Sequence, residues 1–137
     1  MNKVLSLLGL AKKAGRLEAG EEPVGTAARV HGIRLILLAS DAADNTARRA
    51  ERFAEEGACL CARIPATKEQ LGGAVGRGSC AMLALSDVGF ASAIADRLAE
   101  LNEEEYGALA ERLSVKAARA AERKELKKQG KRRPRKK

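Results

Sequence analysis

Hydrophobic positions in residues 1–101 recur at the helical and the strand period in alternation. Helices are predicted from apolar residues three and four positions apart and from the residues that bound them: 2–14, 22–31, 44–56, a short one after Thr67 and one after Asp87. Short apolar runs predict strands over 35–39, 58–62 and 80–85, with 35–39 at the sheet's centre. Strands that alternate with helices predict an α/β fold, a three-layer α/β/α sandwich with a small mixed sheet.

The ends of these helices carry residues suited to capping. Thr67 and Gln70 have the spacing of a capping box, in which each side chain accepts a hydrogen bond from the other residue's backbone N–H. Asp44 and Asp87 are predicted to cap the third and fifth helices. Gly57 is expected to close the third helix.

The pattern changes beyond residue 101. Residues 103 to about 128 keep helical spacing, with basic residues beside the apolar positions, which predicts one long basic helix. Its apolar stripe is mostly alanine, so we expect this helix to be weakly docked or free and to be followed by a disordered tail from Gly130. The chain thus divides into a sandwich domain, 1–101, and a basic helical extension with its tail, 102–137.

Charge is distributed unevenly along the 137 residues. Residues 1–100 hold 13 Lys or Arg and 12 Asp or Glu, whereas residues 101–137 hold 13 and 6, so the net +8 lies almost entirely in the extension. We expect the basic tail to repel itself and to become ordered on a polyanion. Its basic residues are Lys127, Lys128, Lys131, Arg132, Arg133, Arg135, Lys136 and Lys137.

Composition limits the classes of protein and of site. With two Phe, one Tyr and no Trp, the chain is unlike RNA modules that stack several bases on aromatic rings. One His and three Cys without metal spacing predict no metal site, and Cys59 and Cys61 are expected to be small core residues. No apolar stretch approaches the roughly 20 residues of a membrane span, and no export signal is found, so we expect a cytoplasmic protein without a membrane partner.

Catalytic and cofactor motifs are weak in this sequence. The glycine-rich segment 72–78, expected to be a flexible connection, lacks the Lys-Ser/Thr ending of a P-loop and follows a helix rather than a strand. Asp41, Asp44 and Asp87 follow apolar strands, where α/β enzymes keep their acids, but capping explains two of them equally well. We expect neither an enzyme nor a cofactor, and a role for the glycine loop in close approach to RNA, with Arg77 on a phosphate.

Four sequence blocks carry a family resemblance. They are LLGLAKKAGRL (7–17) followed by GEE (20–22), LLASDAADNT (37–46), TKEQLG (67–72) and SDVGFA (86–91). In this order they resemble the bacterial YlxQ-type branch of the kink-turn RNA-binding ribosomal protein superfamily, the L-seven-Ae and L-thirty-e type. The resemblance covers about residues 3–98 and implies an α/β/α sandwich.

The resemblance also implies where RNA would bind. In that family, RNA is held by the start of the second helix and by the loop before the last strand, which correspond to residues 20–26 and 76–80. Where archaeal and eukaryotic members have an Asn-Glu pair and then a Lys, this chain has Glu22-Pro23 and Thr26. The candidate RNA-binding residues are Lys12, Lys13, Arg16, Gly20, Glu21, Glu22, Thr26, Arg29, Gly76, Arg77, Gly78, Ser79 and Cys80.

The sequence leads to one main functional hypothesis and one alternative. The main hypothesis is an RNA-binding protein that recognises structured RNA, kink-turn-like or ribosomal, with a basic tail that adds nonspecific affinity for phosphates. The alternative is a protein-interaction module, whose altered helix start contacts a ribosomal or RNA-processing protein. The sequence identifies no catalytic residue for a third class, an enzyme.

Overall fold

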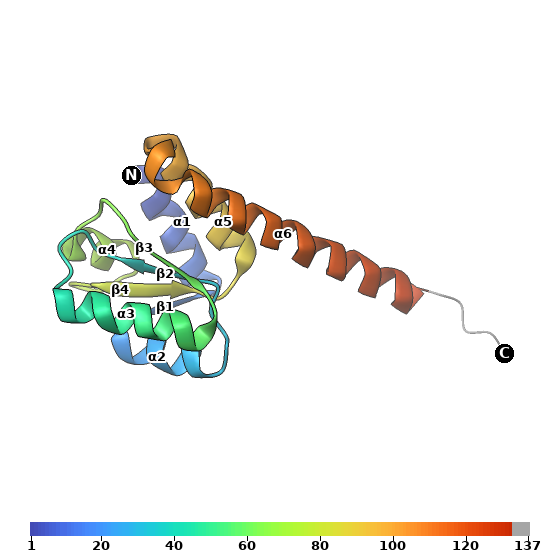
Figure 1. The fold of residues 1–137 in the computed structure, drawn as a ribbon, viewed down its shortest axis with the longest axis horizontal. Coiled ribbons are helices and arrows are strands. Elements are labelled where there is room, and N and C mark those ends of the chain that lie inside the picture. The colour runs from blue at the N-terminus through green and yellow to red at the C-terminus, as the bar shows by residue number, and fades with distance from the viewer. Residues whose placement is uncertain (133–137) are drawn as a thin grey trace.

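The chain folds as a four-stranded sheet between two layers of helices, in a computed structural model that describes residues 1–132, with side chains up to residue 129. The predicted three-layer α/β/α sandwich is confirmed (Figure 1). The helices are α1 (Asn2–Lys13), α2 (Glu21–Arg29), α3 (Asp44–Gly57), α4 (Lys68–Ala74), α5 (Val88–Leu101) and α6 (Glu103–Arg132). The strands are β1 (Leu17–Ala19), β2 (Leu35–Leu38), β3 (Leu60–Arg63) and β4 (Met82–Leu85).

The sheet is mixed and has the strand order β1-β4-β2-β3. β4 pairs antiparallel with both β1 and β2, and β2 pairs parallel with β3. Every residue of β2 and β4 is buried, as expected for strands covered on both faces, which confirms that 35–39 lies at the centre. One end of the sheet is marked by Met82, which pairs with Leu38, and the other by Leu85, which pairs with Leu35.

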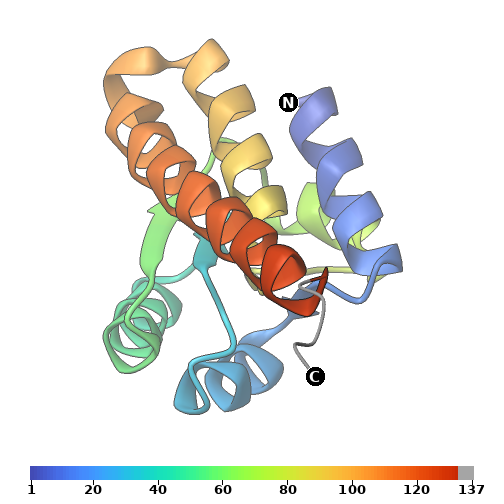
Figure 2. The ribbon, with the colours of Figure 1, turned by 90° about the vertical axis from the view of Figure 1, so that its right-hand side faces the viewer.

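Helices cover both faces of the sheet. α2 and α3 pack on one face, and α1, α4 and α5 pack on the other, with α6 lying outside α5 (Figures 1 and 2). The largest fully buried side chains come from the strands, from the inner faces of α1, α4 and α5, and from Ile33 and Ile64, which lie next to β2 and β3. This arrangement leaves the two ends of the sheet and the β3 edge for loops and for α6.

β1 is absent from the sequence prediction. Its three residues have the burial pattern buried, exposed, buried, which is too short for a period of two to stand out in the sequence. Leu17 pairs with Leu85 and Ala19 with Leu83, so the strand is specified by tertiary contact with β4. β1 matters for the candidate site because it leads directly into Gly20 and the start of α2.

Two of the predicted caps are confirmed. The Thr67 side chain accepts a hydrogen bond from the N–H of Gln70 at 3.1 Å, and the Gln70 side chain accepts one from the N–H of Thr67 at 2.9 Å. Asp87 accepts hydrogen bonds from the N–H groups of Gly89 and Phe90 at the start of α5. These local side-chain bonds fix where α4 and α5 begin.

Both ends of α3 differ from the prediction. Asp44 is the first helical residue, and the cap position belongs to Ala43, which has no side-chain acceptor. Asp44 can still interact favourably with the helix dipole from the first turn. At the other end Gly57 remains helical, and Ala58 adopts the left-handed conformation with φ 52°. Gly57 faces Ala28 of α2, with the position of a Cβ 3.4 Å from the Ala28 Cα, so its small size serves helix packing.

The glycine-rich segment 72–78 is only partly a connection. Gly72 and Gly73 belong to α4, which ends at Ala74, so the flexible link predicted there is wrong for these two residues. Gly72 is buried under the following loop: a Cβ there would lie 2.7 Å from the Ser79 amide nitrogen and 2.8 Å from the Arg77 carbonyl oxygen. Gly76 has φ +75° and turns the chain back, so that the Arg77 N–H donates to the Gly72 carbonyl at 2.7 Å.

α6 is longer and more firmly docked than predicted. Its first part packs on α5, with Tyr106, Ala110 and Leu113 buried, and the Tyr106 hydroxyl donates to the Arg63 carbonyl at 2.9 Å. From residue 121 to 129 every side chain is exposed, so the remainder of the helix projects from the sandwich (Figure 1). The helix continues to Arg132, past the predicted start of a disordered tail at Gly130; the rest of that prediction concerns residues 133–137, outside the described residues.

The contact of Gly72 with the loop can be tested by substitution. Gly72→Ala is expected to lower the free energy of unfolding by about 1–3 kcal/mol, since its Cβ meets backbone atoms that cannot rotate away. Gly73→Ala is the matched control: no atom lies within 4 Å of its Cβ position, so the gain in helix propensity should stabilise by about 0.5–1 kcal/mol. Urea unfolding of both variants measures the difference. Equal stability of the two variants would contradict the packing described here.

Candidate nucleic-acid interface

The start of α2 presents the backbone N–H groups of Glu21 and Glu22 at the Met82 end of the sheet, since Pro23 has none. Gly20 precedes α2 with φ +99°, a conformation that glycine adopts without strain. Its own N–H donates to the Met82 carbonyl at 2.9 Å, and no side chain caps the helix. The first N–H groups of a helix that lack partners are suited to hold a phosphate or another acceptor.

Arg77 joins the glycine loop to this helix start. Its Nη1 donates to the Ala19 carbonyl at 2.6 Å, and a Cβ on Gly20 would lie 2.9 Å from the same nitrogen. The absence of a side chain on Gly20 therefore lets the guanidinium rest on the backbone just before α2. The end of the loop is also joined to the start of α4, because the Cys80 N–H donates to the Lys68 carbonyl at 2.9 Å.

Cys80 and Lys12 lie close to this junction. Cys80 is buried, and its thiol donates to the Met82 carbonyl at 3.1 Å. Burial raises the pKa of the Cys80 thiol, against smaller lowering effects from hydrogen bonding to Met82 and Gly20 and from the charges of Arg77 and Lys12. The thiol therefore stays protonated at neutral pH and serves as a packing and hydrogen-bonding group.

The acidic residues at the helix start are partly neutralised by Arg49, which the sequence analysis did not find. Arg49 of α3 makes two contacts with the Glu21 carboxylate, at 3.0 Å and 3.1 Å. Glu22 is exposed, and its carbonyl accepts a hydrogen bond from the Thr26 hydroxyl at 3.0 Å. The Arg49 pairing joins residues 28 positions apart on different helices, so no local sequence signal announces it.

The structure brings some predicted site residues together and separates others. Gly20, Arg77 and Cys80 meet at the Met82 end of the sheet, with Lys12 near them and the loop residues Gly76, Gly78 and Ser79 exposed. Arg16 belongs to the Leu85 end, since its carbonyl accepts from the Ser86 N–H, and Arg29 is the last residue of α2. Lys13, in the last turn of α1, is exposed.

The basic residues of the predicted tail fall partly outside the described side chains. Lys127 and Lys128 are exposed on the projecting part of α6. Lys131 and Arg132 are helical, but their side chains are not described, and residues 133–137 lie outside the described part.

Two of the three acids considered as catalytic candidates, Asp41 and Asp87, have structural partners. Asp41 accepts a hydrogen bond from the Lys68 N–H at 2.8 Å, which links the loop after β2 to the start of α4. Asp87 caps α5, and Asp44 lies exposed in the first turn of α3. Across the residues that the structure describes, no group of three His, Cys, Asp or Glu residues is placed to hold a metal ion. No helix among them is long and apolar enough to cross a membrane.

The α/β/α sandwich of this chain is similar to solved structures. The structure is similar to the Giardia lamblia 15.5kD RNA binding protein, with a TM-score of 0.57 and 15% identity over 71% of this chain and 85% of that one. It is also similar to a protein of unknown function from Bacillus halodurans C, with a TM-score of 0.64 and 30% identity over 70% of this chain and 96% of that one.

Sequence similarity gives the family. No family model matches the chain. It is 32% identical over 90 residues to the RNA-binding protein YlxQ of Bacillus subtilis (strain 168), a match that covers 63% of this chain and 85% of the relative. The chain therefore belongs to the YlxQ family, and the YlxQ resemblance found in its sequence is confirmed.

Cys61 of β3, close to Cys59 just before the strand, gives the protein a pH dependence that can be measured. Cys59 and Cys61 are half-buried rather than fully in the core. Burial is the main cause that raises the pKa of Cys61 from 9.0 to about 11, with smaller contributions from Cys59 and Glu51. Because the folded state favours the protonated thiol, this contribution to stability is complete below pH 9.0 and is lost as the pH rises to about 11.

The free energy of unfolding should therefore fall between these two pH values, and by less in Cys61→Ala than in the unaltered chain. Urea unfolding at a series of pH values measures this. The same slope in both chains would show that the pKa of Cys61 is not raised.

Proposed function

We propose that this chain binds structured RNA of the kink-turn or ribosomal kind and that it does so in the cytoplasm. The single observation that supports this most is the contact between Arg77 and the backbone at Gly20. It joins the two segments that hold RNA in the superfamily, the start of α2 and the loop before β4. The relative from Bacillus subtilis is named an RNA-binding protein, which supports the same function.

The geometry suggests how RNA would be held. One N–H of the Arg77 guanidinium donates to the Ala19 carbonyl, and among the described residues this side chain has no other hydrogen bond, so its remaining N–H groups can donate to a phosphate or a base edge. In the first turn of α2, Glu21 and Glu22 each have a backbone N–H, and Pro23 has none. We propose that these two N–H groups, with the positive end of the helix dipole, add to the attraction for a phosphate. Arg49 reduces the repulsion that Glu21 would otherwise exert on a phosphate.

The extension would add affinity without selectivity. Lys127 and Lys128 are exposed on the projecting helix, and the sequence continues with a run of further Lys and Arg. Each phosphate that such a cation neutralises steepens the dependence of log affinity on log salt concentration by roughly 0.7–0.9. We propose that residues 1–101 select the RNA and that residues 102–137 strengthen its binding.

A protein-interaction module with a ribosomal or RNA-processing partner is the competing function. The observation that favours it is Glu22, an exposed acid at the helix start, beside a Thr26 hydroxyl that is turned back to the helix backbone. An acid at this position would repel a phosphate and could instead pair with a basic protein surface. The two functions differ in whether the protein binds RNA selectively.

The variant Arg77→Gln distinguishes RNA binding from the protein-interaction function. If the proposed site holds RNA, this variant should reduce the preference for a stem with a kinked internal loop over a continuous stem by about tenfold, or about 1.4 kcal/mol. Equilibrium binding to both RNAs over a salt series provides the measurement. Arg97→Gln is the matched control, because Arg97 is paired with Glu100 on the surface of α5.

Deleting residues 126–137 in the same experiment tests the extension. It should weaken binding to both RNAs alike and flatten the salt dependence, leaving the preference intact. The interaction module would be favoured by two results together. The chain would show no preference for the kinked stem over the continuous stem, with or without Arg77, and a ribosomal or RNA-processing protein would still bind to residues 1–101.

A further inference from the structure

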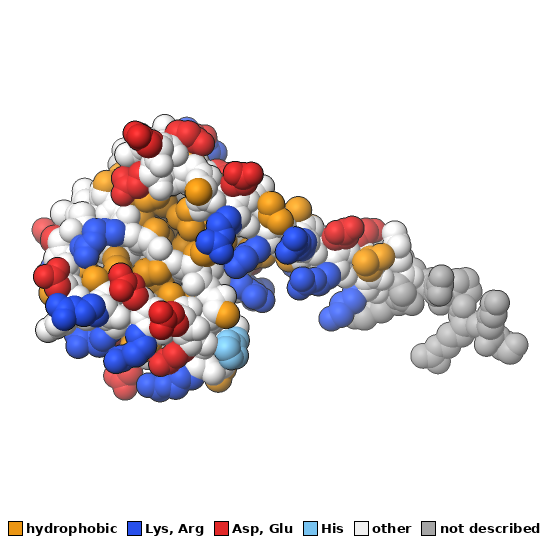
Figure 3. All heavy atoms as spheres, in the orientation of Figure 1, with side chains coloured by type: hydrophobic (Ala, Val, Ile, Leu, Met, Phe, Trp, Pro, Cys, Tyr) orange, Lys and Arg blue, Asp and Glu red, His pale blue; other side chains and the backbone are white. Residues whose placement is uncertain are grey.

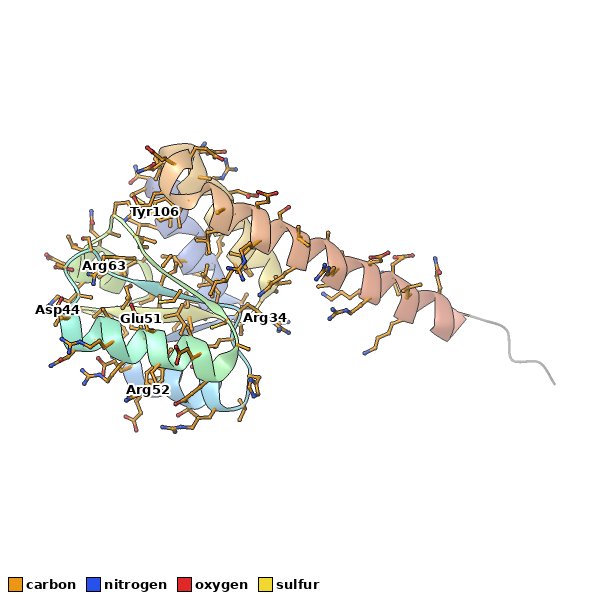
Figure 4. All side chains as sticks on the ribbon, viewed as in Figure 1. Arg34, Asp44, Glu51, Arg52, Arg63 and Tyr106 are labelled. Atoms are coloured by element: carbon orange, nitrogen blue, oxygen red, sulfur yellow. The ribbon has the colours of Figure 1, made fainter. Side chains whose placement is uncertain are left out.

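A second basic surface lies at the opposite end of the sheet from Gly20. A hollow of about 240 Å³ opens there between α6 and the sandwich. Its apolar lining residues are Ile33, Ala58, Val88 and Ala120, with Cys59 beside them. The N–H of Arg34 donates to the Leu85 carbonyl at 2.7 Å, which places the hollow at the Leu85 end of the sheet (Figure 4).

The rim of this hollow is cationic. Four basic residues line it, and no Asp or Glu is among the lining residues: Arg34, Lys116, Arg119 and Arg123. The ion pairs found among the described residues are Arg49–Glu21 and Arg97–Glu100, so they involve none of the four. We call these four residues the α6 basic cluster. Basic side chains gathered without acids repel one another, which favours an anionic partner over a free surface.

The charge pattern of α6 points the same way. Lys116, Arg119 and Arg123 are three and four residues apart, so they share one face of the helix. Glu125 lies on the opposite face from Lys116, and Glu122, three residues after Arg119, lies at the border of the basic face. Figure 3 shows basic side chains along one edge of α6 and acidic ones along the other. The face that holds Lys116, Arg119 and Arg123 is therefore mainly basic.

The face of α6 that packs on the sandwich becomes basic where the sandwich ends. Leu113 is buried, and Ala117 and Ala120 are half-buried, at spacings of four and three residues. The next position on that stripe is Lys124, which is exposed. Lys116 is also near enough to Cys59 for its charge to lower the pKa of that thiol, against a larger rise from burial, so this part of the cluster faces the end of the sheet.

From this geometry we infer that the α6 basic cluster is a second RNA-contact site, which holds the phosphate backbone of a helical stem. The inference rests on the proposed function and extends it to a surface separate from the junction of Gly20 and Arg77. Cations three or four residues apart on a helix are about 4.5–6 Å apart along its axis, so each can reach a different phosphate. Double-stranded RNA is recognised mainly through its shape and backbone, which such a row of cations contacts without reading bases.

Two contacts on one RNA would reinforce each other. A stem that leaves the first site and reaches α6 is bound at a high effective concentration at the second site, so affinity increases without any new base contact. Arg119 and Arg123 suit this role because the planar guanidinium can donate two parallel hydrogen bonds to a phosphate. Binding at this site should be strongly dependent on salt and insensitive to sequence.

The test uses the full chain with Lys116→Gln, Arg119→Gln and Arg123→Gln combined. The matched control removes the same charge elsewhere, through Lys3→Gln, Arg52→Gln and Arg97→Gln on α1, α3 and α5. Both variants are titrated with a stem that contains a kinked internal loop and with a continuous stem of equal length, over a salt series. Thermal unfolding followed by circular dichroism verifies that both variants retain their helices.

The cluster variant should bind both RNAs at least about tenfold more weakly than the control, and its salt slope should be smaller by about 2, as expected for three lost phosphate contacts. The preference for the kinked stem should not change. An affinity and slope equal to those of the control would overturn the second site. In another outcome, the unaltered chain shows no preference for the kinked stem, while the cluster variant still has a lower RNA affinity and a smaller salt slope. This result would reject RNA selection by the junction at Gly20 and would support the second site.

Discussion

The hydrogen bond from the Arg77 guanidinium to the Ala19 carbonyl joins segments 58 residues apart, and the candidate interface depends on it. Two glycines make it feasible. Gly72 lets the loop fold back onto α4, and Gly20 leaves room for the guanidinium beside the backbone. A hydrogen bond from a charged group contributes about 1.5–3 kcal/mol, enough to keep a short loop in one conformation. The loop and the helix start therefore form one preorganised surface.

The fold supplies the rigid background for this surface. β4 lies between β1 and β2 with all four residues buried, so the strand that follows the loop cannot shift relative to the strand that precedes α2. Arg63 further fixes the loop after β2 through hydrogen bonds to the carbonyls of Ala39, Ser40 and Ala42. Loops at this end of the sheet are thus held by neighbours on several sides, as a binding site built from loops requires.

Local signals in the sequence were sufficient for much of the fold. The capping box of Thr67, the Asp87 cap and the apolar runs of β2 and β4 act within a few residues, and each is found where it was predicted. Features that depend on distant residues were missed. β1 pairs with β4, and Ala58 rather than Gly57 takes the left-handed position, while Gly57 packs against Ala28.

The candidate site shows the same difference between features predicted from the sequence and features that depend on distant residues. The resemblance placed Gly20 and Arg77 on the interface, but the Arg49 contact with Glu21 and the hollow beneath α6 depend on how distant elements pack. The prediction that α6 docks weakly was wrong because alanine side chains allow close helix packing. Ala110 packs on α5 between the larger Tyr106 and Leu113. Docking turns a basic helix into part of a shaped surface, since it fixes where the cations lie relative to the sandwich.

The central claim is that the start of α2 and the loop before β4 act as one RNA-binding surface. Amide chemical shifts of the ¹⁵N-labelled full chain, titrated with an RNA stem that contains a kinked internal loop, test this directly. We predict that the N–H groups of residues 20–22 and 76–80 shift together, with the same dependence on RNA concentration. Shifts confined to α6, with Gly20 and Gly78 unchanged, would contradict it.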